Sequence, residues 1–200
     1  MILSFIESLG LLGIFSVVFA ESGLFFGFFF PGDTLLFSAG LLASAGYFNI
    51  FYLFVGSFVC AVLGDSVGYW TGNKLGPKIF SRPDSFFFNK KNLDKTARFY
   101  ERYGKKTIVL ARFVPIVRTF APILAGAGNM KYNVFISYNI IGGFLWTFII
   151  IFSGYFLGNS IKNIDQYILP IMAVIILVSL IPFFTEYFRE KKEKSKANIF

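Results

Sequence analysis

Long apolar tracts alternate with short polar stretches along most of the chain. The tracts cover residues 9–30, 35–45, 50–70, 107–127, 134–157 and 164–184. An apolar run of about 20 residues is long enough to cross the hydrocarbon core of a bilayer as a helix. The pattern therefore predicts an all-α polytopic membrane protein.

Two of the tracts carry features that do not suit a helix exposed to lipid. Prolines, glycine and charged residues interrupt or follow them, namely Glu21, Pro31, Gly32, Asp33, Arg112, Pro115, Arg118 and Pro122. Proline removes a backbone donor, and a charge at bilayer depth is costly unless it is paired or hydrated. Broken, charged segments are tolerated where they are buried in protein or line a cavity. Both segments are therefore predicted to be re-entrant hairpins, with breaks at Pro31, Gly32, Pro115 and Pro122.

The positive charge is concentrated in two places. The chain has a formal net charge of +8, and residues 74–106 hold ten bases against three acids. The tail 186–200 holds five bases against three acids. Because basic connections remain on the cytoplasmic side, both segments are predicted to be cytoplasmic, touching anionic lipid heads.

This orientation gives a repeating topology. A hairpin over 15–45 enters and leaves on the outer side, and a second hairpin over 107–128 enters and leaves on the inner side. Full crossings are expected over 50–70, 134–157 and 164–184. The two hairpin-and-helix units have opposite orientations, an inverted-repeat arrangement common in transporters. We expect one membrane domain over 1–185, which includes the basic connection 74–106, followed by the basic cytoplasmic tail 186–200.

Four charged residues of the broken segments are the first candidates for a site. Glu21 and Asp33 belong to the first segment, and Arg112 and Arg118 to the second. Arginine suits a phosphate because its planar fork donates two parallel hydrogen bonds, and a buried carboxylate can take up and release a proton. The alternative is that the four residues form buried ion pairs that only fix the packing.

Three further polar or aromatic residues are candidates for lining a cavity. Asp65 lies beside glycines that recur every fourth residue from Gly64 to Gly76, a stripe that predicts close helix packing. Asp65 either joins a polar cavity or hydrogen-bonds a neighbouring helix. Asn139 and Trp146 either pack between helices or line the same cavity.

The residue inventory excludes several kinds of chemistry. The chain has no histidine and one cysteine, Cys60, so it cannot form a Ser-His-Asp triad, a Cys/His metal site or an internal disulfide. Residues 64–68 match the G-x-S-x-G pattern of hydrolases by accident, since no histidine accompanies them. We assign no catalytic residue, metal ligand or cofactor, find no nucleic-acid motif, and do not expect an enzyme.

Three stretches of the chain resemble the signatures of one family. The first is Glu21-Ser22-Gly23 followed by Phe30-Pro31-Gly32-Asp33-Thr34-Leu35-Leu36, and the second is Gly64-Asp65-Ser66-Val67-Gly68-Tyr69-Trp70. The third is Arg112-Phe113-Val114-Pro115-Ile116-Val117-Arg118-Thr119, continuing through Pro122, Asn139 and Trp146. Over residues 15–160 the chain resembles the DedA family of membrane proteins, related to VTT-domain lipid scramblases. In its Phe25–Phe30 stretch the chain departs from the family by lacking an extra proline.

The resemblance implies a function as well as a fold. It implies two opposed re-entrant hairpins in the bacterial cytoplasmic membrane, a role in envelope integrity, and return of undecaprenyl phosphate across that membrane, linked to the proton motive force. It also implies that Glu21, Asp33, Arg112 and Arg118 are the functional residues.

The sequence therefore predicts a flippase in which Arg112 and Arg118 bind a lipid phosphate and Glu21 and Asp33 couple its movement to protons. The expected partners are a membrane lipid, either a polyprenyl phosphate or a phospholipid, and protons; glycine-lined faces would permit a homo-oligomer. The alternatives are a proton-coupled cation or small-solute transporter and a non-transporting assembly factor.

Overall fold

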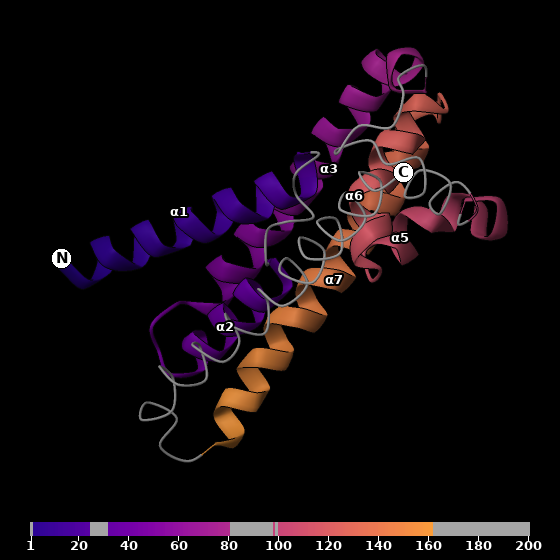
Figure 1. Ribbon diagram of the computed structural model, residues 1–200. Helices are drawn as coiled ribbons and strands as arrows, with labels where there is room; N and C mark the ends of the chain where they lie inside the picture. The colour runs from indigo at the N-terminus through magenta and orange to yellow at the C-terminus, as the bar shows by residue number, and fades with distance from the viewer. Residues whose placement is uncertain (1, 25–31, 81–97, 99, 162–200) are drawn as a thin grey trace, which may run out of the picture.

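The computed structural model describes residues 2–24, 32–80, 98 and 100–161, and all regular structure within these ranges is helical (Figure 1). The helices are α1 (Ile2–Gly23), α2 (Gly32–Ser44), α3 (Ile50–Phe80), α5 (Thr107–Ala111), α6 (Pro115–Ala127) and α7 (Tyr132–Ser160), with a 3-10 turn, η2 (Gly104–Lys106), before α5. The all-α prediction is confirmed for this part of the chain. The predicted break at Pro31 and the crossing over 164–184 lie outside the described residues.

Two long helices, α3 and α7, form the frame of the molecule. Ile50–Leu75 and Tyr132–Ser160 are each long and apolar enough to cross a membrane. The two helices run antiparallel, because Phe54 near the start of α3 meets Phe152 near the end of α7, while Tyr69 further along α3 stacks on Phe135 near the start of α7.

Large apolar side chains cover the outward faces of these two helices. The exposed ones include Phe51, Leu63 and Val67 on α3 and Ile141, Phe144, Phe148, Ile149 and Phe156 on α7. In water so many exposed apolar side chains would drive association. In a bilayer the same faces are matched to the hydrocarbon around them.

The two 13-residue helices, α2 and α6, end in the same way. After α2, the backbone N–H of Gly46 donates to the Ala43 carbonyl and that of Tyr47 to the Leu42 carbonyl, both at 3.1 Å. This pair of bonds is a Schellman motif, which needs a left-handed residue, and Gly46 has φ +83°. The same motif ends α6, where Asn129 takes that position with φ +54°.

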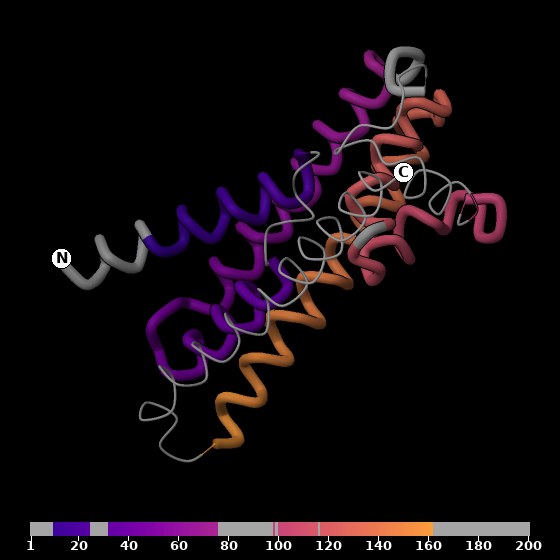
Figure 2. Tube along the Cα trace, viewed as in Figure 1, coloured from indigo at the N-terminus to yellow at the C-terminus, as the bar shows by residue number. Residues whose placement is uncertain are grey.

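Helix α2 lies against α7 (Figure 2), and one glycine from each helix faces the backbone of the other. A Cβ added to Gly40 would overlap the Ile151 carbonyl, and a Cβ added to Gly154 would overlap the Phe37 carbonyl. The two backbones therefore touch directly, which only glycine at both positions allows.

Helix α6 packs against α3 in a matching way, toward the other end of the long helices (Figure 2). A Cβ on Gly72 would overlap the Ile123 carbonyl, and one on Gly126 would overlap the Tyr69 carbonyl. The prediction that the glycine stripe of α3 serves packing is confirmed at Gly72. Each short helix thus packs on the long helix from the other half of the chain.

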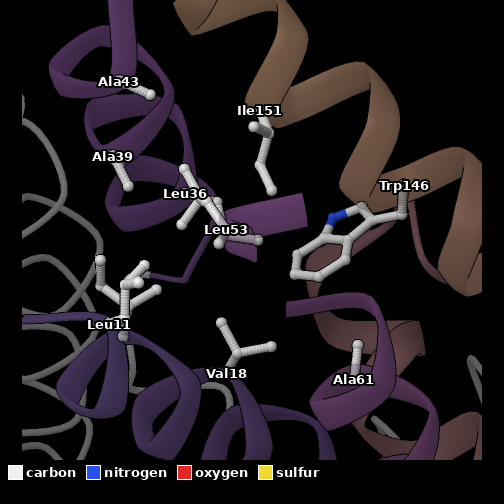
Figure 3. Close-up of a cluster of buried hydrophobic side chains, with 10 residues drawn as sticks. Leu11, Val18, Leu36, Ala39, Ala43, Leu53, Ala61, Trp146 and Ile151 are labelled. Atoms are coloured by element: carbon white, nitrogen blue, oxygen red, sulfur yellow. The ribbon is translucent and has the colours of Figure 1, made fainter. Parts of the chain in front are cut away.

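An apolar core joins α1, α2, α3 and α7. Its fully or nearly fully buried members include Val18, Leu36, Leu53 and Ile151, and Trp146 extends from α7 into the same cluster (Figure 3). Close packing fixes the orientation of these side chains. The indole of Trp146 thereby acquires a defined position beside the charged residues.

Candidate functional site

Arg118 on α6 joins two acidic side chains from two other helices. Its Nη1 donates to Oδ1 of Asp33 on α2 at 2.7 Å, and its Nη2 donates to Oε1 of Glu21 on α1. The Glu21 side chain is 2% exposed and that of Arg118 15%, whereas that of Asp33 is 42% exposed. These three residues, the Arg118 set, therefore extend from the interior of the protein to an accessible edge at Asp33.

Gly32 gives the Glu21 carboxylate the space that it occupies. A Cβ on Gly32 would overlap that carboxylate. Gly32 is also the first residue of α2, so the Glu21 carboxylate lies at the amino-terminal, partly positive end of this helix. Both the missing side chain and the helix dipole favour an anion at this point.

Arg112 belongs to a second set of contacts, centred on α3 and α7. Its Nη2 donates to Asp65 Oδ2 and to Asn139 Oδ1, each at 2.5 Å, and to the Ala61 carbonyl at 3.4 Å. Asn139 in turn donates from Nδ2 to the Val62 carbonyl at 3.1 Å. The Arg112 and Asp65 side chains are only 5% and 7% exposed. This set is more deeply buried than the Arg118 set.

The break between α5 and α6 allows both arginines to enter the interior. The chain turns after Ala111, and Val114 takes an extended conformation before Pro115, the first residue of α6. The residue before a proline disfavours the helical region, and proline suits the first turn because no helical partner is needed for its nitrogen. The predicted break at Pro115 is confirmed.

The indole of Trp146 lies where the two sets meet. Its Nε1 donates to Asp33 Oδ1 at 2.8 Å. The guanidinium carbon of Arg118 lies 5.4 Å from the ring centroid and that of Arg112 lies 5.9 Å from it, both within the range of a cation–π contact. Trp146 thus touches three charged residues.

The two sets together form one charged cluster, and its charges do not cancel. They contain three carboxylates, those of Glu21, Asp33 and Asp65, and two guanidinium groups. With every group ionised, the formal charge is −1. Among the described residues, no group of three or more acidic or cysteine side chains is arranged to hold a metal ion. A proton on one carboxylate would make the cluster neutral.

Comparison with known sequences identifies the family of this chain. Residues 30–156 match the VTT domain. Protein DedA of Escherichia coli K12 is 44% identical over 186 residues, which is 92% of this chain and 84% of that protein. The chain belongs to the DedA family. The resemblance seen in the sequence is therefore confirmed.

Further relatives are named as membrane proteins. An uncharacterized membrane protein of Mycobacterium leprae is 39% identical, covering 92% of this chain and 83% of that protein. Another, from Mycobacterium tuberculosis H37Rv, is 43% identical, covering 85% and 75%. No solved structure matches the chain. Together with the two long apolar helices, these matches make this DedA-family chain a membrane protein.

The structure groups the predicted site residues differently from the expectation. Glu21, Asp33 and Arg118 lie together, as do Arg112 and Asp65. The sequence left open whether Asp65 joins a cavity or bonds a neighbouring helix, and the structure pairs it with Arg112. The two arginines, which were expected to act as one phosphate-binding pair, are held by different acids.

The prediction of a break at Pro122 is wrong. Pro122 lies inside α6, which continues to Ala127. Proline removes one backbone donor and crowds the carbonyl four residues earlier, and packing on a neighbouring helix can offset both. Two features were not predicted: the space that Gly32 leaves for Glu21, and the hydrogen bond from Trp146 to Asp33. The Pro-Gly-Asp motif was the one signal for them in the sequence.

Proposed function

We propose that this DedA-family protein moves a polyprenyl phosphate, undecaprenyl phosphate, across the bacterial cytoplasmic membrane, coupled to the proton motive force. The observation that carries the proposal is the Arg118 fork, whose two terminal nitrogens each hold a carboxylate, the buried one of Glu21 and the accessible one of Asp33. A phosphate presents two oxygens in the same arrangement as two carboxylate oxygens. It could therefore replace Asp33 and Glu21 on Arg118.

The exchange links phosphate binding to proton uptake. When a phosphate takes Arg118, Glu21 and Asp33 lose that arginine as a partner, and Glu21 is left as a buried anion. An unpaired buried charge is costly, and a carboxylate escapes that cost by taking up a proton. Protonation of the two acids therefore accompanies entry of the phosphate, and its release returns the protons. The long prenyl tail would remain in the bilayer, so only the head group needs to cross.

The short helices support a re-entrant arrangement as part of this proposal. A 13-residue helix such as α2 or α6 is about 20 Å long, whereas the hydrocarbon core is about 30 Å thick. The hairpin that contains each short helix would enter and leave the membrane on the same side. The basic connection 74–106 and the tail 186–200 would lie in the cytoplasm. Opposed hairpins that meet at the charged cluster would open it to one leaflet at a time.

A non-transporting assembly factor is the second candidate. All three carboxylates of the cluster have an arginine partner, as expected if the ion pairs only fix the packing. In that case lysine at position 118 should preserve function, because charge alone would suffice. The net charge of −1 would also suit a proton-coupled cation transporter, although two buried arginines repel a cation.

The test follows the lipid phosphate in proteoliposomes. Undecaprenyl phosphate is incorporated, and its protection from an external probe is measured for the wild type and for Arg118→Lys, with and without an inward proton gradient. Arg102→Lys is the matched control, because Arg102 is exposed outside the cluster. Movement that is lost only in Arg118→Lys and accelerated by the gradient supports the proposal. Absence of movement with folded wild-type protein refutes it.

A further inference from the structure

Asp33 shares one oxygen between two donors. Its Oδ1 accepts from Arg118 Nη1 at 2.7 Å and from Trp146 Nε1 at 2.8 Å. The two donors come from different helices, α6 and α7. If Arg118 turns to another anion, the indole hydrogen bond remains, so Asp33 keeps a partner during the exchange.

The indole is suited to this task by its chemistry and by its packing. Its N–H is a donor only and carries no charge, so it cannot exchange protons with the carboxylate or compete for a phosphate as a cation would. The side chain is 3% exposed and belongs to the apolar core with Leu36 and Ile151 (Figure 3). The donor is therefore fixed in position independently of Arg118.

We propose that Trp146 is a positioning residue that holds Asp33 in place while Arg118 changes from carboxylate to phosphate. The exchange of carboxylate for phosphate on Arg118 rests on the proposed function. The hydrogen bond between Trp146 and Asp33 is independent of that function. It also gives Trp146 a role in coupling, because the N–H stabilises the ionised form of the carboxylate and so influences the pH at which the exchange occurs.

Other charged groups act on Asp33 at the same time. Among the described residues, Arg118 from α6 pairs with Asp33 and Glu21 from α1 shares that arginine, while Arg112 and Asp65 from α3 pair with each other beside them. None of them is changed when Trp146 is replaced by phenylalanine. That substitution keeps an aromatic ring near both guanidinium groups and removes only the N–H donor and part of the ring.

Transport provides the first test. In proteoliposomes with undecaprenyl phosphate, Trp146→Phe should move the midpoint of the pH–rate profile to higher pH, because it removes a hydrogen bond that favours the ionised carboxylate. The highest rate should be kept. Trp70→Phe is the matched control, because Trp70 is 50% exposed, and should leave the profile unchanged. A uniform loss of rate at an unchanged midpoint would mean that Trp146 only packs, and would overturn the proposal.

Fluorescence provides a test that does not depend on transport. The chain has two tryptophans, so Trp70→Phe leaves Trp146 as the only one. Its emission should depend on pH, should keep that dependence when Arg118→Gln is added, and should lose it when Asp33→Asn is added instead. Loss of the dependence in Arg118→Gln would overturn the proposal, because the indole would then not hold Asp33 on its own. Failure of lipid movement with this result intact would refute the flippase function alone.

Discussion

Arg112 and Arg118 use their guanidinium groups differently, so the same substitution to lysine should have unequal effects at the two positions. Arg118 holds two carboxylates with two separate nitrogens. Within the part of the chain that the structure describes, the Arg112 side chain makes its three hydrogen bonds from Nη2, and its buried Nε meets no acceptor. A lysine ammonium has one nitrogen with three donors. It can reproduce the contacts of Arg112 but not the fork of Arg118.

The magnitudes follow from the partners that are left behind. Arg118→Lys frees either Glu21 or Asp33, and losing a hydrogen bond to a charged group costs about 1.5 to 3 kcal/mol. This predicts a loss of lipid movement of about 10- to 100-fold, since 1.36 kcal/mol corresponds to tenfold. Arg112→Lys removes an unpaired donor, which offsets the shorter reach of lysine, and we expect a loss below about tenfold.

The assay is phosphate protection in proteoliposomes, with equal amounts of folded protein verified by size-exclusion chromatography. Arg102→Lys, at an exposed position, controls for the substitution itself. Equal losses in Arg112→Lys and Arg118→Lys would refute the reasoning, because the number of nitrogens in use would then not decide the effect. A fully active Arg118→Lys would favour the assembly factor.

Three further predictions concern packing and pairing. Gly40→Ala should lower the free energy of unfolding in detergent by about 1 to 3 kcal/mol because two backbones touch there, whereas Gly13→Ala, with open space around it, should raise it by up to about 1 kcal/mol. Asp65→Asn should lower it by about 3 kcal/mol, since Arg112 would lose its buried counter-charge. Gly32→Ala should stop lipid movement, as its Cβ would occupy the site of the neighbouring carboxylate; normal movement would contradict that geometry.

The helices and the break before Pro115 could be predicted from the sequence. Apolar tracts of spanning length leave few alternatives to a helix, because the bilayer leaves no partner for free backbone groups. A charged residue in such a tract must also find a partner inside the protein. For this reason Glu21, Asp33, Arg112 and Arg118 could be expected to lie near one another.

The pairing of each arginine could not be predicted. Asp65 and Arg112 lie on segments far apart in the chain, and the apolar pattern says that each is buried without saying which faces which. Their register depends on how α3 and the end of α5 pack on α7, where Gly142 faces Arg112 and Gly143 faces Val62. The hydrogen bond from Trp146 to Asp33 could not be predicted either, because an indole in an apolar tract is equally consistent with a side chain that only packs.

Each short helix packs on a long helix from the other half of the chain, and this affects how the protein is inserted into the membrane. Helix α2 emerges from the ribosome early, but the backbone of α7 on which it rests is made last among the described helices. The acids Glu21 on α1 and Asp33 on α2 likewise precede Arg118 in synthesis. During insertion the first half therefore carries unmatched anions and an uncovered glycine face, and native contacts of such long sequence separation form slowly. The nascent chain must be protected from degradation and aggregation until its second half is synthesised. This fold therefore requires that the first half stay in the insertion machinery for that time.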